Sequence, residues 1–362
     1  MSKSNSKRTL FLAIKNIIEE AQHQIVRNIN TTMLITYFEI GRMIVEGELN
    51  GADRATYAEQ TVRQLSIDLT KEFGRGYSKS NLEYMRQFYM MYKNRIVQSA
   101  LGQSKHSLKS KPESPLPNSS IIQSMIGQSD FPFKLSWTHY VQLLKIDDEK
   151  ERSFYEIEAS QNNWSVRELT RQFNSAIYER VALSKDKKGI KQLAEKGQVI
   201  EKPTDTLKSH YVLEFLDLKE DSRYSESDLE TAIINKLEHF MLELGKGFLF
   251  EGRQRRFTFE GDSFYVDMVF YNRLLRCFVL FDLKLGKLTH QDIGQMQMYV
   301  NYYDRMIKSP EENPTIGIVL CKEENKTVVE FTLPENNKTI FAKEYKAVLP
   351  SKADLKRQLK DG

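Results

Sequence analysis

Two apolar stretches, separated by a short polar turn, each carry one aspartate where a buried strand is expected. The first is Phe264-Tyr-Val-Asp-Met-Val-Phe-Tyr271, with Asp267 near its centre. The second is Cys277-Phe-Val-Leu-Phe-Asp-Leu-Lys284, in which Asp282 precedes Lys284 by two residues. A carboxylate in so hydrophobic a run is costly unless a cation neutralises it. Because side chains alternate along a strand, Asp282 and Lys284 project from the same face.

The turn between the stretches, Asn272-Arg-Leu-Leu275, predicts an antiparallel hairpin. The midpoint between Asp267 and Asp282 falls inside this turn, so the hairpin would bring the two carboxylates roughly opposite each other. Together with Lys284 they predict a divalent metal site with a cationic helper. Two simpler interpretations stay open. Asp282 and Lys284 would form an ordinary ion pair on one strand, or Asp267 would face solvent on an edge strand.

An aspartate followed by Asp-x-Lys on the next strand resembles the PD-(D/E)XK nuclease signature. Val266 stands where the signature has its proline. The motif is short, but here it falls on consecutive predicted strands with a predicted helix before and after them. That placement makes the resemblance much more specific than the three residues alone.

The C-terminal half predicts mixed helix and strand from about residue 205. Ser227-Asp-Leu-Glu230 has the spacing of a capping box and predicts the start of a helix that ends at Gly245. The elements expected after it are strands near 248–259, 264–271 and 276–284, a helix over about 289–303 and a buried strand over 315–321. Helix, three strands, helix, strand is the αβββαβ order of the restriction-endonuclease-like core. The fold class expected for the whole chain is therefore α/β, with several domains.

The N-terminal half predicts helices. Apolar residues recur at helical spacing over about 9–29, 32–46 and 52–70, and a fourth helix follows a glycine turn, Phe73-Gly-Arg-Gly-Tyr77, from about Ser80. Helices resume at Trp137, and Ser165-Val-Arg-Glu168 is a second capping box. The expected domains are a helical region over 1–98, a flexible Ser-, Pro- and Lys-rich insertion over 99–130, a helical continuation over 131–184, a linker over 185–204, a nuclease domain over 205–350 and a tail over 351–362.

The chain resembles the YhcG family of bacterial proteins over nearly its whole length. The resemblance implies a winged-helix-like, all-α N-terminal region joined to a PD-(D/E)XK nuclease domain. Family members often carry glutamate at the position of Asp282. The segments that carry the resemblance are Tyr37–Glu46, Leu69–Tyr89, Leu135–Tyr140, Trp164–Leu169, Tyr211–Leu216, Phe270-Tyr271, Asp282-Leu-Lys284 and Ile316–Cys321.

The resemblance and the residue types imply a metal-dependent endonuclease. Asp267 and Asp282 supply hard oxygen ligands for Mg²⁺, with Mn²⁺ as a substitute, and the main-chain carbonyl of Leu283 is a further candidate ligand. Lys284 would orient the attacking water or stabilise the charged transition state. A non-catalytic nucleic-acid-binding or assembly protein with a vestigial nuclease fold, and an RNA-cleaving nuclease, remain alternatives.

Two further residues are weaker candidates for the site. Glu230 resembles the glutamate of the first core helix in such nucleases, although a place in the capping box explains it equally well. Gln295 and Gln297 lie on the helix after the motif and are about 200° apart, so at most one of them points inward. We prefer Gln297, because Tyr299 beside it fits the family pattern.

Basic residues in both halves are candidates for contacts with nucleic acid. Arg253, Arg255 and Arg256 precede the first acidic strand and suit phosphate binding, or form a solvated basic turn. On the helix after the glycine turn, Lys79, Arg86 and Lys93 suit contacts with the DNA backbone, or are merely solvated. We expect the aromatic residues of this region, Tyr57, Phe73, Tyr77 and Phe88, to be core.

Composition is consistent with this interpretation. The chain has 362 residues, 40% hydrophobic and 28% charged, with a net charge of +4 and two cysteines. Its pI near 8.7 permits a nucleic-acid partner, DNA in the first place. Cys277 and Cys321 lie in apolar runs and are expected in the core, and no zinc-ligand spacing occurs. No apolar run approaches ~20 residues, which excludes a membrane partner and predicts a bacterial cytoplasmic protein. A homodimer is compatible with the sequence.

Overall fold

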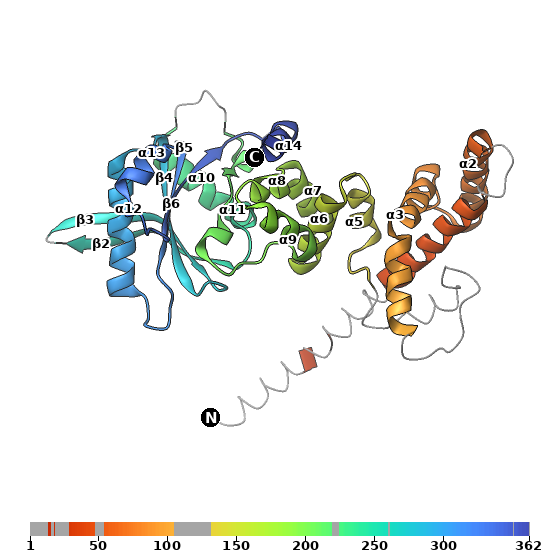
Figure 1. Cartoon of the computed structure of the whole chain (residues 1–362), viewed down its shortest axis with the longest axis horizontal. Coiled ribbons are helices and arrows are strands. Elements are labelled where there is room, and N and C mark those ends of the chain that lie inside the picture. Colours follow the sequence, from red (N-terminus) through yellow and green to blue (C-terminus); the bar gives the residue numbers. More distant parts are fainter. Residues whose placement is uncertain are drawn as a thin grey trace. The chain divides into compact units, whose positions relative to one another are not determined.

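The structure is a computed structural model. It describes residues 14–15, 18, 29–47, 54–104, 132–218, 224–259, 261–349 and 351–361 (Figure 1). The chain divides into two compact units, Met1–Arg152 and Ser153–Gly362. None of the helices in these described ranges is long and apolar enough to cross a membrane.

The described part of the first unit is helical. Its helices are 29–47, α2 (Arg54–Phe73), α3 (Lys79–Ser104) and α5 (Trp137–Leu143). Gly74 and Gly76 have positive φ, so the predicted glycine turn before α3 is confirmed. The buried face of α3, including Leu82 and Met85, packs against Ile44 of the first of these helices.

The aromatic residues that we expected in the core of this unit differ in their burial. Phe88 is fully buried as predicted, but Phe73 is 66% exposed, so its assignment to the core was wrong. Phe73 ends α2 beside the glycine turn, and there its ring contacts only the half-buried ring of Tyr77 among the described aromatic pairs. Residues 99–104 of the expected insertion are the last residues of α3 and not a flexible segment. The side chain of Tyr57, most of the helix expected over 9–29 and residues 105–130 of the expected insertion lie outside the described residues. The residues that are described in this unit contain no strand that would form a wing.

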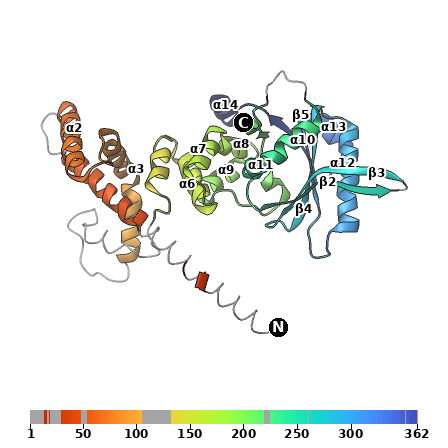
Figure 2. The ribbon, with the colours of Figure 1, turned by 180° about the vertical axis from the view of Figure 1, so that it is seen from behind.

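The second unit is built on one six-stranded sheet with the order β1-β6-β5-β4-β3-β2 (Figures 1 and 2). β2–β3 and β3–β4 are antiparallel, whereas β4–β5, β5–β6 and β6–β1 are parallel. The strands are β1 (His210–Val212), β2 (Phe248–Phe259), β3 (Asp262–Asn272), β4 (Cys277–Lys287), β5 (Ile316–Glu323) and β6 (Ile340–Lys346).

Helices cover both faces of this sheet. α10 (Glu226–Asn235) and α11 (Leu237–Leu244) pack their apolar residues on one face, and α12 (His290–Tyr302) packs on the other. The order α10/α11, β2, β3, β4, α12, β5 confirms the predicted αβββαβ core. The expected single helix up to Gly245 is two helices, because the chain bends at Lys236. Cys277 and Cys321 are buried in the core as expected.

Helices that precede the sheet in the chain belong to the same compact unit. They are α6 (Glu149–Gln161, from Ser153 onward), α7 (Val166–Asn174), α8 (Ile177–Ala182) and α9 (Lys187–Lys196). The predicted capping box of Ser165 and Glu168 is confirmed at the start of α7. α9 occupies the segment 185–204 that we expected to be a linker. It is amphipathic despite its many lysines, with Leu193 buried.

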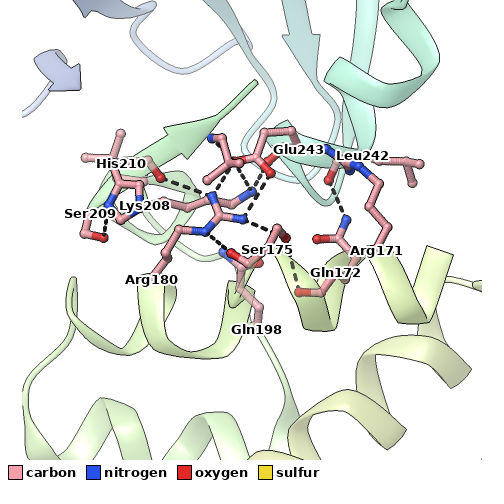
Figure 3. Close-up of polar contacts among 12 residues, drawn as sticks. Arg171, Gln172, Ser175, Arg180, Gln198, Lys208, Ser209, His210, Leu242 and Glu243 are labelled. Atoms are coloured by element: carbon pink, nitrogen blue, oxygen red, sulfur yellow. Dashed lines mark hydrogen bonds and ion pairs between the residues drawn. The ribbon is translucent and has the colours of Figure 1, made fainter. Parts of the chain in front are cut away.

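A buried charge network joins α8 to the sheet and to α11 (Figure 3). Arg180 donates to both carboxylate oxygens of Glu243, and the same carboxylate accepts the backbone N–H of Val212 on β1 at 2.9 Å. The ammonium of Lys208 lies 3.7 Å from this carboxylate, and all three charged side chains are fully buried. Removing Glu243 would leave two buried cations without a counter-charge. α8 is therefore part of the compact unit that carries the sheet.

The last segment is also helical. α14 (Lys352–Asp361) occupies the residues that we expected to be a tail. Its Leu355 is buried, and Lys352 and Lys356 lie within 4 Å of the buried carboxylate of Glu179 on α8, at 3.7 and 3.9 Å. An amphipathic repeat of only three turns explains why the sequence did not indicate this helix.

Candidate active site

The predicted hairpin is present with the predicted register. β3 and β4 pair from Asn272↔Cys277 to Met268↔Phe281, so the next residues, Asp267 and Asp282, follow opposite each other. The side-chain oxygen of Asn272 accepts the backbone N–H groups of Leu274 and Leu275 and fixes the turn. This turn chemistry is local, which is why the sequence predicts it.

The two strands part at Asp267. The ladder between β3 and β4 ends at Met268, and the N–H of Leu283 donates instead to Asp267 Oδ2 at 2.8 Å. β3 continues with β2 alone from here, and the pair extends as a two-stranded arm beyond the rest of the sheet (Figures 1 and 2). The divergence holds the Asp267 carboxylate next to the backbone between Asp282 and Lys284.

Asp282 and Lys284 form an ion pair on β4. The Lys284 ammonium lies 2.9 Å from Asp282 Oδ2 and 3.7 Å from Glu226 Oε2 on α10. Glu226 also accepts a hydrogen bond from the backbone N–H of Leu285 at 3.3 Å, which connects the start of α10 to β4. Asp282 is 2% exposed, so the carboxylate of this ion pair is buried.

Burial and neighbouring charges shift the pKa values of all three groups. Burial first, and the charge of Asp267 second, raise the pKa of Asp282 to about 7, although Lys284 attracts the ionised form. Burial likewise raises the pKa of Asp267, against its hydrogen bond from Leu283. Burial alone would lower the pKa of Lys284, but Asp282 and then Glu226 raise it above its ordinary value. Lys284 therefore stays charged, but its positive charge does not fully offset the burial and mutual repulsion of the two acids.

Glu230 shares its hydrogen-bond partner Gln254 with Asp267 and is not part of a helix cap. The capping box of α10 is formed by Ser225 and Asp228, so our assignment to Ser227 and Glu230 was wrong. Glu230 is 5% exposed, and its Oε2 accepts the amide N–H of Gln254 on β2. Burial, and then the charge of Asp267, raise the pKa of Glu230. Its other oxygen, Oε1, is buried without a hydrogen-bond partner.

These residues fit a divalent cation. Within the described ranges, no group of three or more His, Cys, Asp or Glu side chains is placed so that it could hold a metal ion. Mg²⁺ needs only one or two protein carboxylates, because it keeps several of its waters. Asp267 and Asp282 could supply these, and a cation would relieve their mutual repulsion. The buried Oε1 of Glu230 is an unpartnered acceptor.

The two glutamines of α12 are distinguished by their contacts. The amide of Gln295 donates to the hydroxyl of Tyr299, whose pKa is raised by burial and, less strongly, by the charges of Asp282 and Asp267. Among the described side-chain hydrogen bonds, none involves Gln297. Gln295, rather than the preferred Gln297, is thus hydrogen-bonded to Tyr299, whose pKa the two aspartates raise.

The three arginines are strand residues of β2 and not a turn. Arg255 pairs with Glu251, and Arg256 donates to Ser263 at 3.1 Å across the arm. Arg253 acts on Glu230 through its charge. On α3 of the first unit, Lys79 lies 3.9 Å from Glu83, and Lys93 is exposed.

The sequence did not indicate Gln254 or Glu226 as members of the site. Gln254 contacts acids from two other elements, which no local spacing reveals. Glu226 and Glu230 are four residues apart and share one face of α10, a signal that was available once the helix begins at Ser225.

Comparison with known proteins identifies relatives for both halves of the chain. Residues 204–360 match the family model described as the YhcG PDDEXK nuclease domain, and residues 13–180 match the DUF1016 N-terminal domain. The chain is 40% identical over 348 residues to "Putative nuclease YhcG" of Escherichia coli (strain K12), a match that covers 96% of this chain and 92% of that protein.

Two solved structures show a distant likeness. One is described as the crystal structure of a repair endonuclease from Pyrococcus abyssi, with 16% identity, a TM-score of 0.25 and coverage of 36% of this chain and 50% of that one. The other, described as the structure of an EndoMS–dsDNA2 complex, has 14% identity, a TM-score of 0.25 and coverage of 37% and 50%. Both scores are too low to bear on function. The curated relative and the two family matches decide the assignment: this chain belongs to the YhcG family and carries the PD-(D/E)XK nuclease domain of that family.

Proposed function

We propose that this protein is a divalent-metal-dependent endonuclease that hydrolyses phosphodiester bonds of DNA, with Mg²⁺ as its cofactor. One observation carries the proposal. Where β3 and β4 separate, Asp267 accepts a hydrogen bond from the backbone N–H of Leu283 and so lies beside Asp282. Asp282 in turn forms an ion pair with Lys284. The match to a PDDEXK nuclease domain and the name of the curated relative support the reaction class.

Each residue of the site has a part in this proposal. Asp267, Asp282 and the main-chain carbonyl of Leu283 hold the cation. A bound Mg²⁺ supplies a water of lowered pKa and offsets charge that develops on the phosphate. The Lys284 ammonium orients the nucleophile and stabilises the same charge as a preorganised donor. Glu226 keeps this ammonium in place through its 3.7 Å contact.

Nucleic acid is proposed to bind through basic residues of both units. Arg253 lies opposite Met268, directly before the arm begins, and Arg256 lies on the arm, where they would contact phosphates near the scissile bond. Arg255 is already paired with Glu251, which makes it the weakest of the three arginines. Lys79, Arg86 and Lys93 on α3 would add contacts from the first unit.

The test is cleavage by the purified full chain. Supercoiled, linear, branched and single-stranded DNA, and RNA, are incubated with Mg²⁺, with Mn²⁺ or with EDTA, beside an Asp282→Asn variant. We expect cleavage of DNA by the wild type with either metal, and none with EDTA or with the variant. Cleavage of RNA but not of DNA would show that RNA is the substrate. Binding without cleavage of any substrate would contradict the proposal and favour a non-catalytic nucleic-acid-binding protein.

A further inference from the structure

Gln254 contacts two acids of the site from a third element. Its Nε2 donates to Glu230 Oε2 on α10 and, at 3.3 Å, to Asp267 Oδ1 on β3. A primary amide carries two N–H donors and can therefore give one to each carboxylate. Without such a donor, two like charges brought this close would separate.

The backbone of Gln254 is unusual for its residue type. Its φ is +46°, in the left-handed region that a residue with a Cβ adopts only at a cost. It lies opposite Asp267, between the pairs Arg253↔Met268 and Arg255↔Val266, just after the register shift at Gly252. A conformation of this kind persists where the surrounding contacts require it, and such positions gather at functional sites.

We propose that Gln254 is a positioning residue that holds the carboxylates of Glu230 and Asp267 together beside the proposed cation. This inference rests on the proposed function. By occupying Glu230 Oε2, the amide leaves the buried Oε1 as the oxygen available to a cation. A glutamate of the same length would offer acceptors only and would repel both acids.

Two substitutions separate the amide from the backbone strain. Gln254→Gly removes the amide but adopts a φ of +46° without strain, so the metal-free variant should melt close to the wild-type temperature, because the relief of strain offsets the loss of the donor to Glu230. Its affinity for Mn²⁺ should fall by roughly 10–100-fold, as is usual when a residue that orients a ligand is removed. Gln254→Glu should instead lower the melting temperature of the metal-free protein.

The measurement is calorimetric titration of the full chain with Mn²⁺, without nucleic acid, together with thermal melting in EDTA. Asp267→Asn serves as the reference. If Gln254→Gly binds Mn²⁺ like the wild type while Asp267→Asn does not, the positioning role is overturned and the proposed function stands. A large loss of stability in Gln254→Gly would also overturn the positioning role, because the residue would then be structural. A wild type that binds no Mn²⁺ would overturn both.

Discussion

At the scale of single residues, the site combines charges that the fold could not keep for stability alone. Asp282 is nearly inaccessible and its pKa is raised to about 7. The Lys284 ammonium that pairs with it also pairs with Glu226. Burying a carboxylate whose negative charge is only partly neutralised costs free energy. Such a cost persists at sites where a bound cation neutralises the remaining charge. We therefore interpret the acids as a site that metal binding stabilises.

A residue-scale prediction concerns stability without metal. Asp267→Asn keeps an acceptor for the N–H of Leu283 but removes the charge that raises the pKa of Asp282. The metal-free variant should be as stable as the wild type or more stable, by up to about 1 kcal/mol, which is roughly 2–4 °C in melting temperature for a unit of this size. Thermal melting in EDTA measures it. Asp262→Asn, at the exposed end of the same strand, is the control and should change nothing. A fall of several degrees in Asp267→Asn would show that the carboxylate is structural.

At the scale of elements, buried charged side chains join α8 to β1 and α11. His210 on β1 lies within this network, and its backbone oxygen accepts from Arg180 at 3.1 Å. Its Nε2 is buried without a hydrogen-bond partner. Burial first, and then the positive charges of Arg180, Lys346 and Lys208 against that of Glu243, lower the pKa of His210 to about 4.

This shift predicts a loss of stability in acid. Because the unfolded chain binds a proton at about pH 6.5 and the folded chain only near pH 4, the folded state loses stability as pH falls through this window. The contribution of His210 is up to about 3 kcal/mol. Denaturant unfolding at several pH values measures it, with His210→Phe as the comparison. If the variant has the same slope of stability against pH between 6.5 and 4 as the wild type, the imidazole is not the titrating group.

The elements also show how far sequence reasoning reaches. The strands β2 to β4 and the turn at Asn272 were predictable, because alternating apolar residues and turn chemistry are local signals. The start of α10 was not, because Ser225-Glu-Ser-Asp228 and Ser227-Asp-Leu-Glu230 have the same spacing and only packing chooses between them. Gln254 was invisible for a related reason: its contacts join three elements that are separate in the sequence.

At the scale of the whole molecule, the two compact units suggest a division of labour. The acids, Lys284 and the arm belong to the second unit, whereas the basic residues of α3 belong to the first. We expect the first unit to hold nucleic acid through its basic side chains while the second unit cuts it. Affinity and cleavage should then respond to different substitutions.

A whole-molecule prediction follows for the first unit. Replacing Lys79, Arg86 and Lys93 together by alanine should weaken DNA binding across sequences. The logarithmic salt dependence of binding should become flatter by up to ~0.9 for each phosphate that is no longer neutralised. Fluorescence anisotropy at several salt concentrations measures both. The control removes the same charge elsewhere in the unit, at the exposed residues Lys134, Lys145 and Lys150. Equal affinity and slope in the α3 variant and the wild type would make a protein-interaction role the better interpretation of this unit.

The central claim, that Asp267, Asp282 and Lys284 form a catalytic site, is tested most directly by single-turnover cleavage with Lys284→Ala. Its matched control is Lys287→Ala, an exposed lysine of the same strand that pairs with Glu323 at 3.2 Å. With DNA binding checked by anisotropy, we predict nearly normal affinity for both variants and cleavage reduced at least ~10²-fold in Lys284→Ala only. Cleavage by Lys284→Ala at the wild-type rate would contradict the claim.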